Sequence, residues 1–473
     1  MIALSKIDNV TWAASGAITT QGLRFLSTIT ISRLIIAEDI GTYAITLTIV
    51  NALLLFSDIG ITPSIIQNHR SEDSGFLGTA WTMQASRGLI VSVFAILIAY
   101  PISTFYGNPK LYLLLPVIGL TALIDGLSST RIPRYYKSGR IKEIVLLEGA
   151  SQAIATIAGI TYAILTNSVW ALAITALTFS SCKTLFSHIF LSGHNGKPFT
   201  FILPHAKVIF SFGKWIFLST IFTYLSNNLD RLMLGKIMDL STLGYYAIGT
   251  TIATFPFFTF TKINQTILFP LFSRHNKSPS IVLDFFQQTK QALLPQITIA
   301  MLLLLTSSEL IIATIYPESF QPASRAINAL CFCSWLSINE SINGSLLISK
   351  GHPKLTAMST SAKTFGLAIL MPLLTYNYGF NGALISVCIS EFFKYSSSSY
   401  ILYVKYNIKP SCEVGHLILF LLLFLFIASL RQYTQVYISN VQFTGAGIVL
   451  LFIIWLTFCA KRLIHWNNSL KRL

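Results

Sequence analysis

The stretch from Gly88 to Tyr100 has the sequence GLIVSVFAILIAY, in which Ser92 is the only side chain that is neither apolar nor aromatic. It lies within a longer run at residues 77–104, and an α-helix needs roughly 20 such residues to cross a bilayer. Similar runs recur along all 473 residues, so the sequence predicts an all-α, polytopic membrane protein. An outer-membrane barrel would instead show alternating segments of about 10 residues.

The composition supports the same class. Hydrophobic residues make up 53% of the chain and charged residues 11%, whereas a soluble protein has roughly 25% charged residues. These values exclude a soluble globular protein and a disordered one. The net charge of +16 does not indicate a nucleic-acid partner, because Lys and Arg lie mostly in short connections between apolar runs, as in the cytoplasmic loops of membrane proteins.

We predict about fourteen transmembrane helices, each an apolar run long enough to span a bilayer. Their approximate limits are residues 11–36, 40–66, 77–104, 111–130, 143–165, 169–191, 209–234, 243–272, 291–316, 323–349, 355–377, 381–404, 415–431 and 443–464. An even number of spans places both ends of the chain on one side of the membrane.

The distribution of basic residues predicts the orientation. Connections on the N-terminal side, together with the segment after the last span, contain 22 Lys and Arg residues, and the opposite connections contain 4. The more basic side of a membrane protein faces the cytoplasm. We therefore expect a multi-pass protein of the cell inner (plasma) membrane with both termini in the cytoplasm.

The chain also contains one internal repeat. The hexapeptide IGTYAI at residues 40–45 opens the second predicted span, and LGYYAI at residues 243–248 opens the eighth, an offset of 203 residues. Further matches map spans 1–6 onto spans 7–12, so both halves have the same orientation and their axis should run along the membrane normal. The expected parts are an N-terminal six-helix lobe at 1–208, a C-terminal six-helix lobe at 209–410 and two additional transmembrane helices at 411–473.

Charged side chains occur inside several spans, where each costs about 2.5–3.5 kcal/mol on insertion scales and usually faces a bundle interior or a water-filled cavity. The basic ones are candidates for attracting an anion into a cavity, since Arg binds phosphate through two hydrogen bonds and Lys acts as a point charge. They are Arg24, Arg87, Lys262, Lys363 and Lys394. Among the acidic residues, which are expected to pair with these or with backbone, the candidates for ion coupling are Asp58, Asp125 and Glu340.

Arg24 is the strongest of these candidates, because it lies about half-way along the first span and has no acidic residue within one turn. Arg33 follows at about 900° around the helix, so it points to the opposite face and should reach the outer interface. The i,i+3 spacing of Glu391 and Lys394 leaves open that these two residues simply pair with each other.

The sequence contains none of the common motifs of enzymes or of cofactor sites. It has no Walker loop, no HExxH and no GxSxG, and its eight histidines show no convincing metal spacing. We therefore expect a protein that is not an enzyme and that has no metal or other cofactor.

Several stretches resemble polysaccharide flippases, the O-antigen and colanic-acid type translocases of the multidrug/oligosaccharidyl-lipid/polysaccharide exporter superfamily. They occur in the order typical of that family, across about residues 5–410. They are Ala37–Ala44, Asp58-Ile59-Gly60-Ile61, Ile66-Gln67, the FLGTAW sequence at 76–81, Asp230-Arg231-Leu232 with Gly235, Gly244-Tyr245-Tyr246, Pro256 and Phe269-Pro270.

This resemblance implies two six-helix lobes in a V around a central cavity, with alternating access to the two sides of the membrane. It implies a polyprenyl-diphosphate-linked oligosaccharide as cargo, moved from the cytoplasmic to the outer leaflet for the assembly of surface polysaccharide such as lipopolysaccharide. Cavity arginines and lysines of the family are thought to meet the diphosphate, and Arg24 suits that role best. The implied partners are the lipid-linked oligosaccharide, membrane lipids and polysaccharide assembly proteins.

Two other functions stay open. An ion-coupled small-molecule or drug antiporter of the same superfamily would carry net acidic charge in its cavity, whereas the residues inside these spans are basic in both halves. A membrane-embedded biosynthetic enzyme would need a sizeable external loop with catalytic groups, whereas the external turns here are short, such as the one with Glu38 and Asp39.

Overall fold

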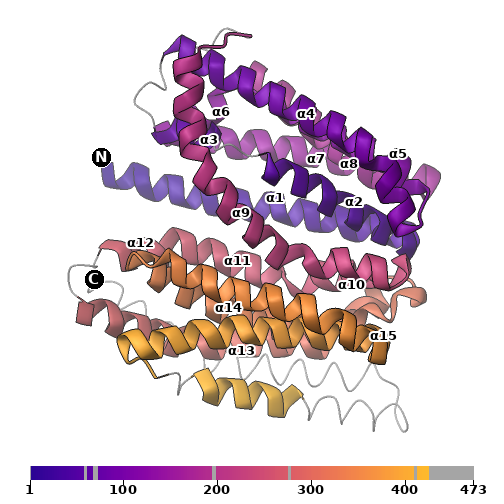
Figure 1. The fold of residues 1–473 in the computed structure, drawn as a ribbon, viewed down its shortest axis with the longest axis vertical. Coiled ribbons are helices and arrows are strands. Elements are labelled where there is room, and N and C mark those ends of the chain that lie inside the picture. Colours follow the sequence, from indigo (N-terminus) through magenta and orange to yellow (C-terminus); the bar gives the residue numbers. More distant parts are fainter. Residues whose placement is uncertain are drawn as a thin grey trace. The chain divides into compact units, whose positions relative to one another are not determined.

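The computed structural model describes residues 2–57, 61–67, 73–193, 199–274, 279–409 and 413–424. These residues form helices and short connections, and none of them lies in a β-strand. The expected all-α class is confirmed (Figure 1). By the contacts that residues make in space, the chain divides into two compact units, Met1–Ala247 and Ile248–Leu473.

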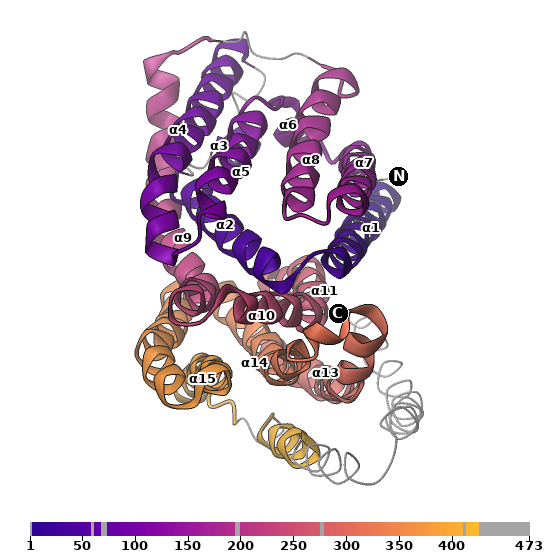
Figure 2. The same cartoon turned by 90° about the vertical axis from the view of Figure 1, so that its right-hand side faces the viewer.

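The first unit contains nine complete helices in its described residues, and a tenth begins within it. They are α1 (Ile2–Leu34), α2 (Ala37–Phe56), α3 (Ile61–Gln67), α4 (Ser74–Tyr106), α5 (Lys110–Gly126), α6 (Arg131–Ser138), α7 (Ile141–Thr166), α8 (Trp170–Ile189), α9 (Leu203–Ile237) and the beginning of α10 (Leu240–Ala253). Helices α1, α7 and α8 lie side by side, and α4 packs along α5 (Figure 2).

The described part of the second unit consists of α-helices together with one π-helix and one 3₁₀ helix. Its elements are α11 (Phe255–Ile263), the π-helix η1 (Asn264–Leu268), α12 (Phe269–Arg274), α13 (Pro279–Ile315), the 3₁₀ helix η2 (Glu318–Phe320), α14 (Ala323–Ser349), α15 (Pro353–Tyr406) and a helix at Glu413–Phe424. Helix α14 packs against both α13 and α15.

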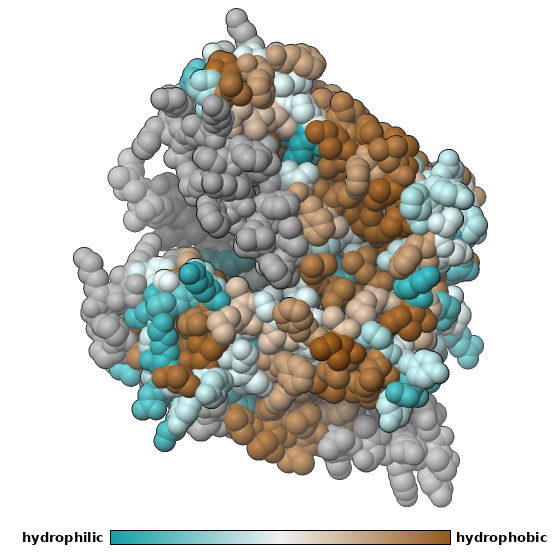
Figure 3. Space-filling view, in the orientation of Figure 1, coloured by the Kyte–Doolittle hydropathy of each residue, from teal (hydrophilic) through white to brown (hydrophobic). Residues whose placement is uncertain are grey.

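The helix that contains the apolar stretch 88–100 has clear signals at both ends. At the start of α4, the Asp73 carboxylate accepts a hydrogen bond from the Gly75 backbone N–H at 2.9 Å, which satisfies one free donor of the first turn. At its end, Gly107 adopts a φ of 67°, a left-handed conformation that glycine reaches without strain. Hydrophobic side chains such as Leu89, Phe94 and Leu97 remain exposed on α4, and Figure 3 shows a broad hydrophobic area over α4 and α5.

The predicted spans correspond to these helices with some breaks. The second span is divided into α2 and α3, and the eighth into α10, α11, η1 and α12. The eleventh and twelfth spans are the two halves of α15, which turn at Gly379, where φ is 57° and ψ is −138°. The thirteenth begins at the helix Glu413–Phe424, and the fourteenth, at 443–464, lies outside the described residues.

Length and hydropathy support fewer spans when each helix is taken alone. Within the described part of the chain, five helical segments are long and apolar enough to cross a membrane: α2, α4, α7, Val282–Ile315 of α13, and α15. Helices α5 and α6, bent by 59° between them, make a sixth if they count as one span. The number fourteen therefore stays a prediction.

The two copies of the sequence repeat meet at their glycines. A Cβ atom on Gly41 would lie 1.9 Å from the Leu240 carbonyl oxygen, and one on Gly244 would lie 1.9 Å from the Ala37 carbonyl oxygen. Residues 37 and 240, like residues 41 and 244, are separated by the repeat offset of 203. The contact is therefore reciprocal, as a local two-fold relation requires. Both segments belong to the first unit.

Helix α9, which the repeat places at the start of the second lobe, packs within the first unit. The Tyr224 hydroxyl donates to the Thr48 carbonyl of α2. The Lys236 ammonium donates to the Phe105 carbonyl of α4 at 2.6 Å. These contacts explain why the unit boundary lies at 247/248 and not at 208/209. The lobe limits describe a relation of sequence and stay a prediction.

Candidate functional site

Arg87 of α4 contacts the end of α2, where the second predicted span is interrupted. Its Nε donates to the Ser57 hydroxyl at 3.0 Å and its Nη2 donates to the Leu54 carbonyl at 2.6 Å. Helix α2 ends at Phe56, and the last carbonyls of a helix have no partner within it. Arg87 therefore caps α2 inside the bundle. Asp58, a sequence-predicted candidate for ion coupling, lies outside the described residues.

Arg24 of α1 and Lys183 of α8 share one aromatic ring. The Arg24 Cζ lies 5.7 Å from the centroid of the Phe179 ring, and the Lys183 Nζ lies 5.9 Å from the same centroid. Both distances fall within the range of about 6 Å for cation–π attraction. Phe179 and Lys183 are four residues apart on α8, so they share a helix face.

Asp125, near the end of α5, lies beside this pair. Its Oδ1 is 3.7 Å from the Lys183 Nζ, and its Oδ2 accepts a hydrogen bond from the Ser180 hydroxyl at 3.3 Å. Both charged side chains are partly exposed, 26% for Lys183 and 37% for Asp125. Arg24, Asp125, Phe179 and Lys183 are called the Phe179 cluster below.

Three contacts place Asp125 at this position. The Gln84 side chain of α4 donates to the Asp125 backbone carbonyl at 3.1 Å. The Thr184 hydroxyl of α8 donates to the Ile124 carbonyl at 2.9 Å. A Cβ on Gly88 would lie 2.4 Å from the Ala122 carbonyl oxygen, so only glycine allows α4 to approach α5 this closely. The end of α5 is thus fixed from both sides.

Two members of the cluster, Arg24 and Lys183, lie away from the ends of their helices, whereas Asp125 is next to the last residue of α5. Arg24 is ten residues before the end of α1 at Leu34, a rise of about 15 Å. Lys183 is six residues before the end of α8 at Ile189, a rise of about 9 Å. In the predicted topology, the cluster extends from the middle of the bilayer toward its cytoplasmic side.

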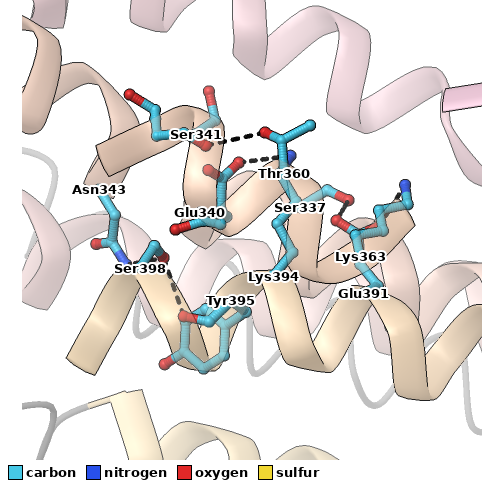
Figure 4. Close-up of polar contacts among 12 residues, drawn as sticks. Ser337, Glu340, Ser341, Asn343, Thr360, Lys363, Glu391, Lys394, Tyr395 and Ser398 are labelled. Carbon is cyan, nitrogen blue, oxygen red and sulfur yellow. Dashed lines mark hydrogen bonds and ion pairs between the residues drawn. The ribbon is translucent and has the colours of Figure 1, made fainter. Parts of the chain in front are cut away.

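In the second unit, the structure pairs two of the predicted basic residues with carboxylates. Lys363 Nζ lies 2.6 Å from Glu391 Oε2, and Lys394 Nζ lies 2.8 Å from Glu340 Oε2. The Ser337 hydroxyl also donates to Glu391 at 2.7 Å. Figure 4 shows both pairs at the contact between α14 and the two halves of α15. These side chains are at most 16% exposed.

The interpretation that Glu391 and Lys394 pair with each other is therefore wrong. Both side chains lie on the face of α15 that meets other helical segments, and each finds a closer partner there. Local spacing allowed their pairing, but tertiary packing decided it. Lys262 lies in α11, and its side chain is outside the described part of the chain.

Sequence reasoning missed a third buried pair. Lys290 of α13 forms an ion pair with Glu413, and their side chains are 5% and 6% exposed. Lys290 also donates to the Asn343 side chain, and the Tyr395 hydroxyl donates to Glu413. Lys290 is one of the 22 basic residues counted on the cytoplasmic side in the sequence analysis. Nothing local in the sequence relates residues 123 positions apart.

It also missed Lys183, which the charge count assigned to the cytoplasmic side. The available signal was its position inside the sixth predicted span, residues 169–191, one turn after Phe179. In the described residues, no group of three or more His, Cys, Asp and Glu side chains is arranged to bind a metal ion.

The two units differ in what their cations can do. The lysines in the described pairs of the second unit already have close, buried carboxylate partners. The Phe179 cluster contains two cations and one carboxylate, at a longer distance and in a more open position. Of the described intramembrane charges, those of the Phe179 cluster best suit reversible binding of an anion.

Comparison with solved structures shows which fold the chain has. The chain is similar to the lipid II flippase MurJ in an inward closed conformation, with a TM-score of 0.74 and 11% identity, covering 98% of this chain and 100% of that one. It is also similar to an inward-facing multidrug resistance transporter of the MATE family in the MOP superfamily, with a TM-score of 0.62 and 13% identity, covering 87% and 96%. The chain therefore has the polytopic, all-helical fold of these two membrane proteins.

Sequence comparison gives the family. The family model described as polysaccharide biosynthesis protein matches residues 30–325, and the chain belongs to this family. It is 25% identical over 374 residues to the lipopolysaccharide biosynthesis protein WzxC of Escherichia coli (strain K12), covering 76% of this chain and 73% of WzxC. It is 22% identical over 300 residues to the teichuronic acid biosynthesis protein TuaB of Bacillus subtilis (strain 168), covering 63% and 62%. The resemblance stated from the sequence motifs is confirmed.

Proposed function

We propose that this protein is a flippase that moves polyprenyl-diphosphate-linked oligosaccharide units from the cytoplasmic to the outer leaflet, by alternating access, for the assembly of surface polysaccharide. Membership of the polysaccharide biosynthesis family and a transporter fold support this proposal. A relative named succinoglycan biosynthesis transport protein ExoT, from Rhizobium meliloti (strain 1021), is 20% identical over 281 residues and adds to this support.

The observation that carries the proposal is the Phe179 cluster. Arg24 and Lys183 flank one ring inside the helices, with Asp125 as the acidic member. A charged side chain at such a depth costs about 2.5–3.5 kcal/mol on insertion scales. A diphosphate offers oxygens for two hydrogen bonds from Arg24 and a negative charge for Lys183. Its binding must stay modest, because a deep free-energy minimum would slow release of the cargo.

The cluster also bears on the alternative of a drug or small-cation antiporter. A cation would meet two positive side chains and one carboxylate there, a net repulsion. An anionic cargo fits the charge balance better. For the alternative of a membrane-embedded enzyme, we likewise propose that the protein transports its cargo and does not form bonds in it.

The remaining assignments follow from this function. We place the protein in the inner membrane with both termini in the cytoplasm, with lobes at 1–208 and 209–410 and two further helices at 411–473. Its partners would be the lipid-linked oligosaccharide, membrane lipids and polysaccharide assembly proteins. Arg87, Lys262, Lys363 and Lys394 remain secondary candidates for the diphosphate, and Asp58 and Glu340 for ion coupling.

Complementation of a strain that lacks its own flippase tests the proposal. Arg24→Ala should abolish surface polysaccharide while the protein level in membranes stays normal. Arg24→Lys should keep part of the activity, since the charge survives but the two-bond geometry does not. Arg33→Ala, on the opposite helix face, is the matched control and should export nearly normally. Full export by Arg24→Ala would refute the assignment.

A further inference from the structure

We propose that Asp125 is a displaceable counter-ion: it neutralises Lys183 when the site is empty, and the diphosphate of the cargo takes its place. This inference rests on the proposed function, since it describes how the same site binds and releases its anion. It assigns Asp125 a role other than ion coupling.

The first argument is the length of the contact. Lys183 Nζ and Asp125 Oδ1 are 3.7 Å apart, whereas a charge-assisted N–H···O bond measures about 2.7–2.9 Å. Oδ1 is itself buried, and no described residue donates a hydrogen bond to it. The Ser180 hydroxyl holds only Oδ2, at 3.3 Å. Asp125 is thus close enough to offset the charge of Lys183 but is not locked to it.

The second argument is the contrast with the second unit. Lys363–Glu391 and Lys394–Glu340 are 2.6 and 2.8 Å long, and their carboxylates are 3% and 8% exposed. The Asp125 side chain is 37% exposed. Breaking a buried pair is strongly unfavourable, because an uncompensated charge remains. The Asp125 side chain already has part of its surface in solvent, so its carboxylate can turn toward water when another anion arrives.

The third argument concerns the site as a whole. Without Asp125, Arg24 and Lys183 would be two like charges beside one ring, which disfavours the empty site. With a tight carboxylate, Lys183 would be lost to the cargo. A loosely held Asp125 avoids both outcomes. After displacement it still repels the bound diphosphate, which limits affinity and favours release.

Two substitutions should therefore shift binding in opposite directions. Asp125→Asn keeps the shape and the contact with Ser180 but removes the competing charge, so diphosphate should bind about 3- to 10-fold more tightly. Asp125→Glu adds one methylene and can close the 3.7 Å gap to Lys183, so diphosphate should bind more weakly. A merely structural role for Asp125 would weaken binding in both variants.

The test is a binding measurement on the purified full-length protein in lipid nanodiscs, with farnesyl diphosphate as the probe and farnesyl monophosphate for comparison. Glu143→Gln is the matched control, because Glu143 forms an ion pair with Arg140 at 3.0 Å on exposed side chains and has no hydrogen bond or ion pair with the four residues of the cluster. It should leave the Kd unchanged. Thermal unfolding of each variant confirms that it is folded.

The outcomes separate the two proposals. If wild type binds the diphosphate and Asp125→Asn binds it no more tightly, the counter-ion role is overturned while the proposed function stands. The same holds if Asp125→Glu fails to weaken binding. If Arg24→Ala and Lys183→Ala leave diphosphate binding unchanged, the proposed site itself fails.

Discussion

Gly41 and Gly244 approach each other's helices reciprocally. Each would place a Cβ 1.9 Å from a carbonyl oxygen of the opposite segment, at Leu240 for Gly41 and at Ala37 for Gly244. These four residues form two pairs at the repeat offset of 203. The contact joins the beginnings of α2 and α10, and only a residue without a side chain allows it.

Replacing either glycine should destabilise the protein. Gly41→Ala or Gly244→Ala should each lower stability by about 1–3 kcal/mol, because the new methyl group meets backbone and the helices must separate. Because the two sites share one contact, the double variant should lose less than the sum of the single losses. Thermal unfolding of the purified protein measures the effect.

The control for this prediction is Gly149→Ala in α7, where a Cβ meets nothing within 4 Å. It should be neutral or slightly stabilising, because alanine favours a helix by roughly 0.5–1 kcal/mol over glycine. Equal effects at all three positions would mean that the reciprocal contact is not close.

Arg87 should act on stability more than on the cargo. Arg87→Ala removes two hydrogen bonds from a charged donor, while the Ser57 hydroxyl still donates to the Leu54 carbonyl at 2.9 Å. The loss of stability should be about 1.5–3 kcal/mol, the range for hydrogen bonds to a charged group. Arg87→Lys should recover only part of the loss, since one ammonium cannot reproduce the two directed bonds. Thermal unfolding and farnesyl diphosphate binding, measured together, separate the roles. A large loss of diphosphate binding with normal stability would contradict this and would indicate that Arg87 binds the cargo.

The buried pairs of the second unit should respond to charge in a linked way. Glu391→Gln leaves Lys363 without its closest carboxylate and should destabilise by about 3–5 kcal/mol. The double variant Glu391→Gln with Lys363→Met should recover much of that loss, because no unpaired charge remains. Denaturation midpoints of Glu391→Gln, Lys363→Met and the double variant give the coupling. Additive losses would show that the two side chains do not interact.

The sequence predicted the class of fold, and it singled out Arg24 as a candidate for binding the cargo. Apolar runs of membrane length and the offset of 203 were visible in the chain. Arg24 was visible because no carboxylate lies within one turn. These signals are local or periodic, so a single sequence carries them.

The partners of the charged residues could not be predicted in the same way. Lys183 meets Asp125 from 58 positions away in the sequence, and Lys290 meets Glu413 from 123 positions away. Glu391 and Lys394 are the reverse case. Their spacing in the sequence allowed them to pair with each other, but in the structure each pairs with a residue of another helical segment. Which lysine is free for an anion depends on distance and burial, and both arise only from packing.

The most direct test of the central claim is a transbilayer assay with purified protein in liposomes. The probe is a fluorescent polyprenyl-diphosphate-linked sugar whose label is quenched only in the accessible leaflet. Wild-type protein should accelerate its movement between leaflets well beyond protein-free vesicles, and the matching monophosphate lipid should move more slowly. Combining Arg24→Ala with Lys183→Ala should reduce the rate almost to that of protein-free vesicles. Movement at the wild-type rate in this double variant would contradict the claim that the Phe179 cluster binds the diphosphate during transport.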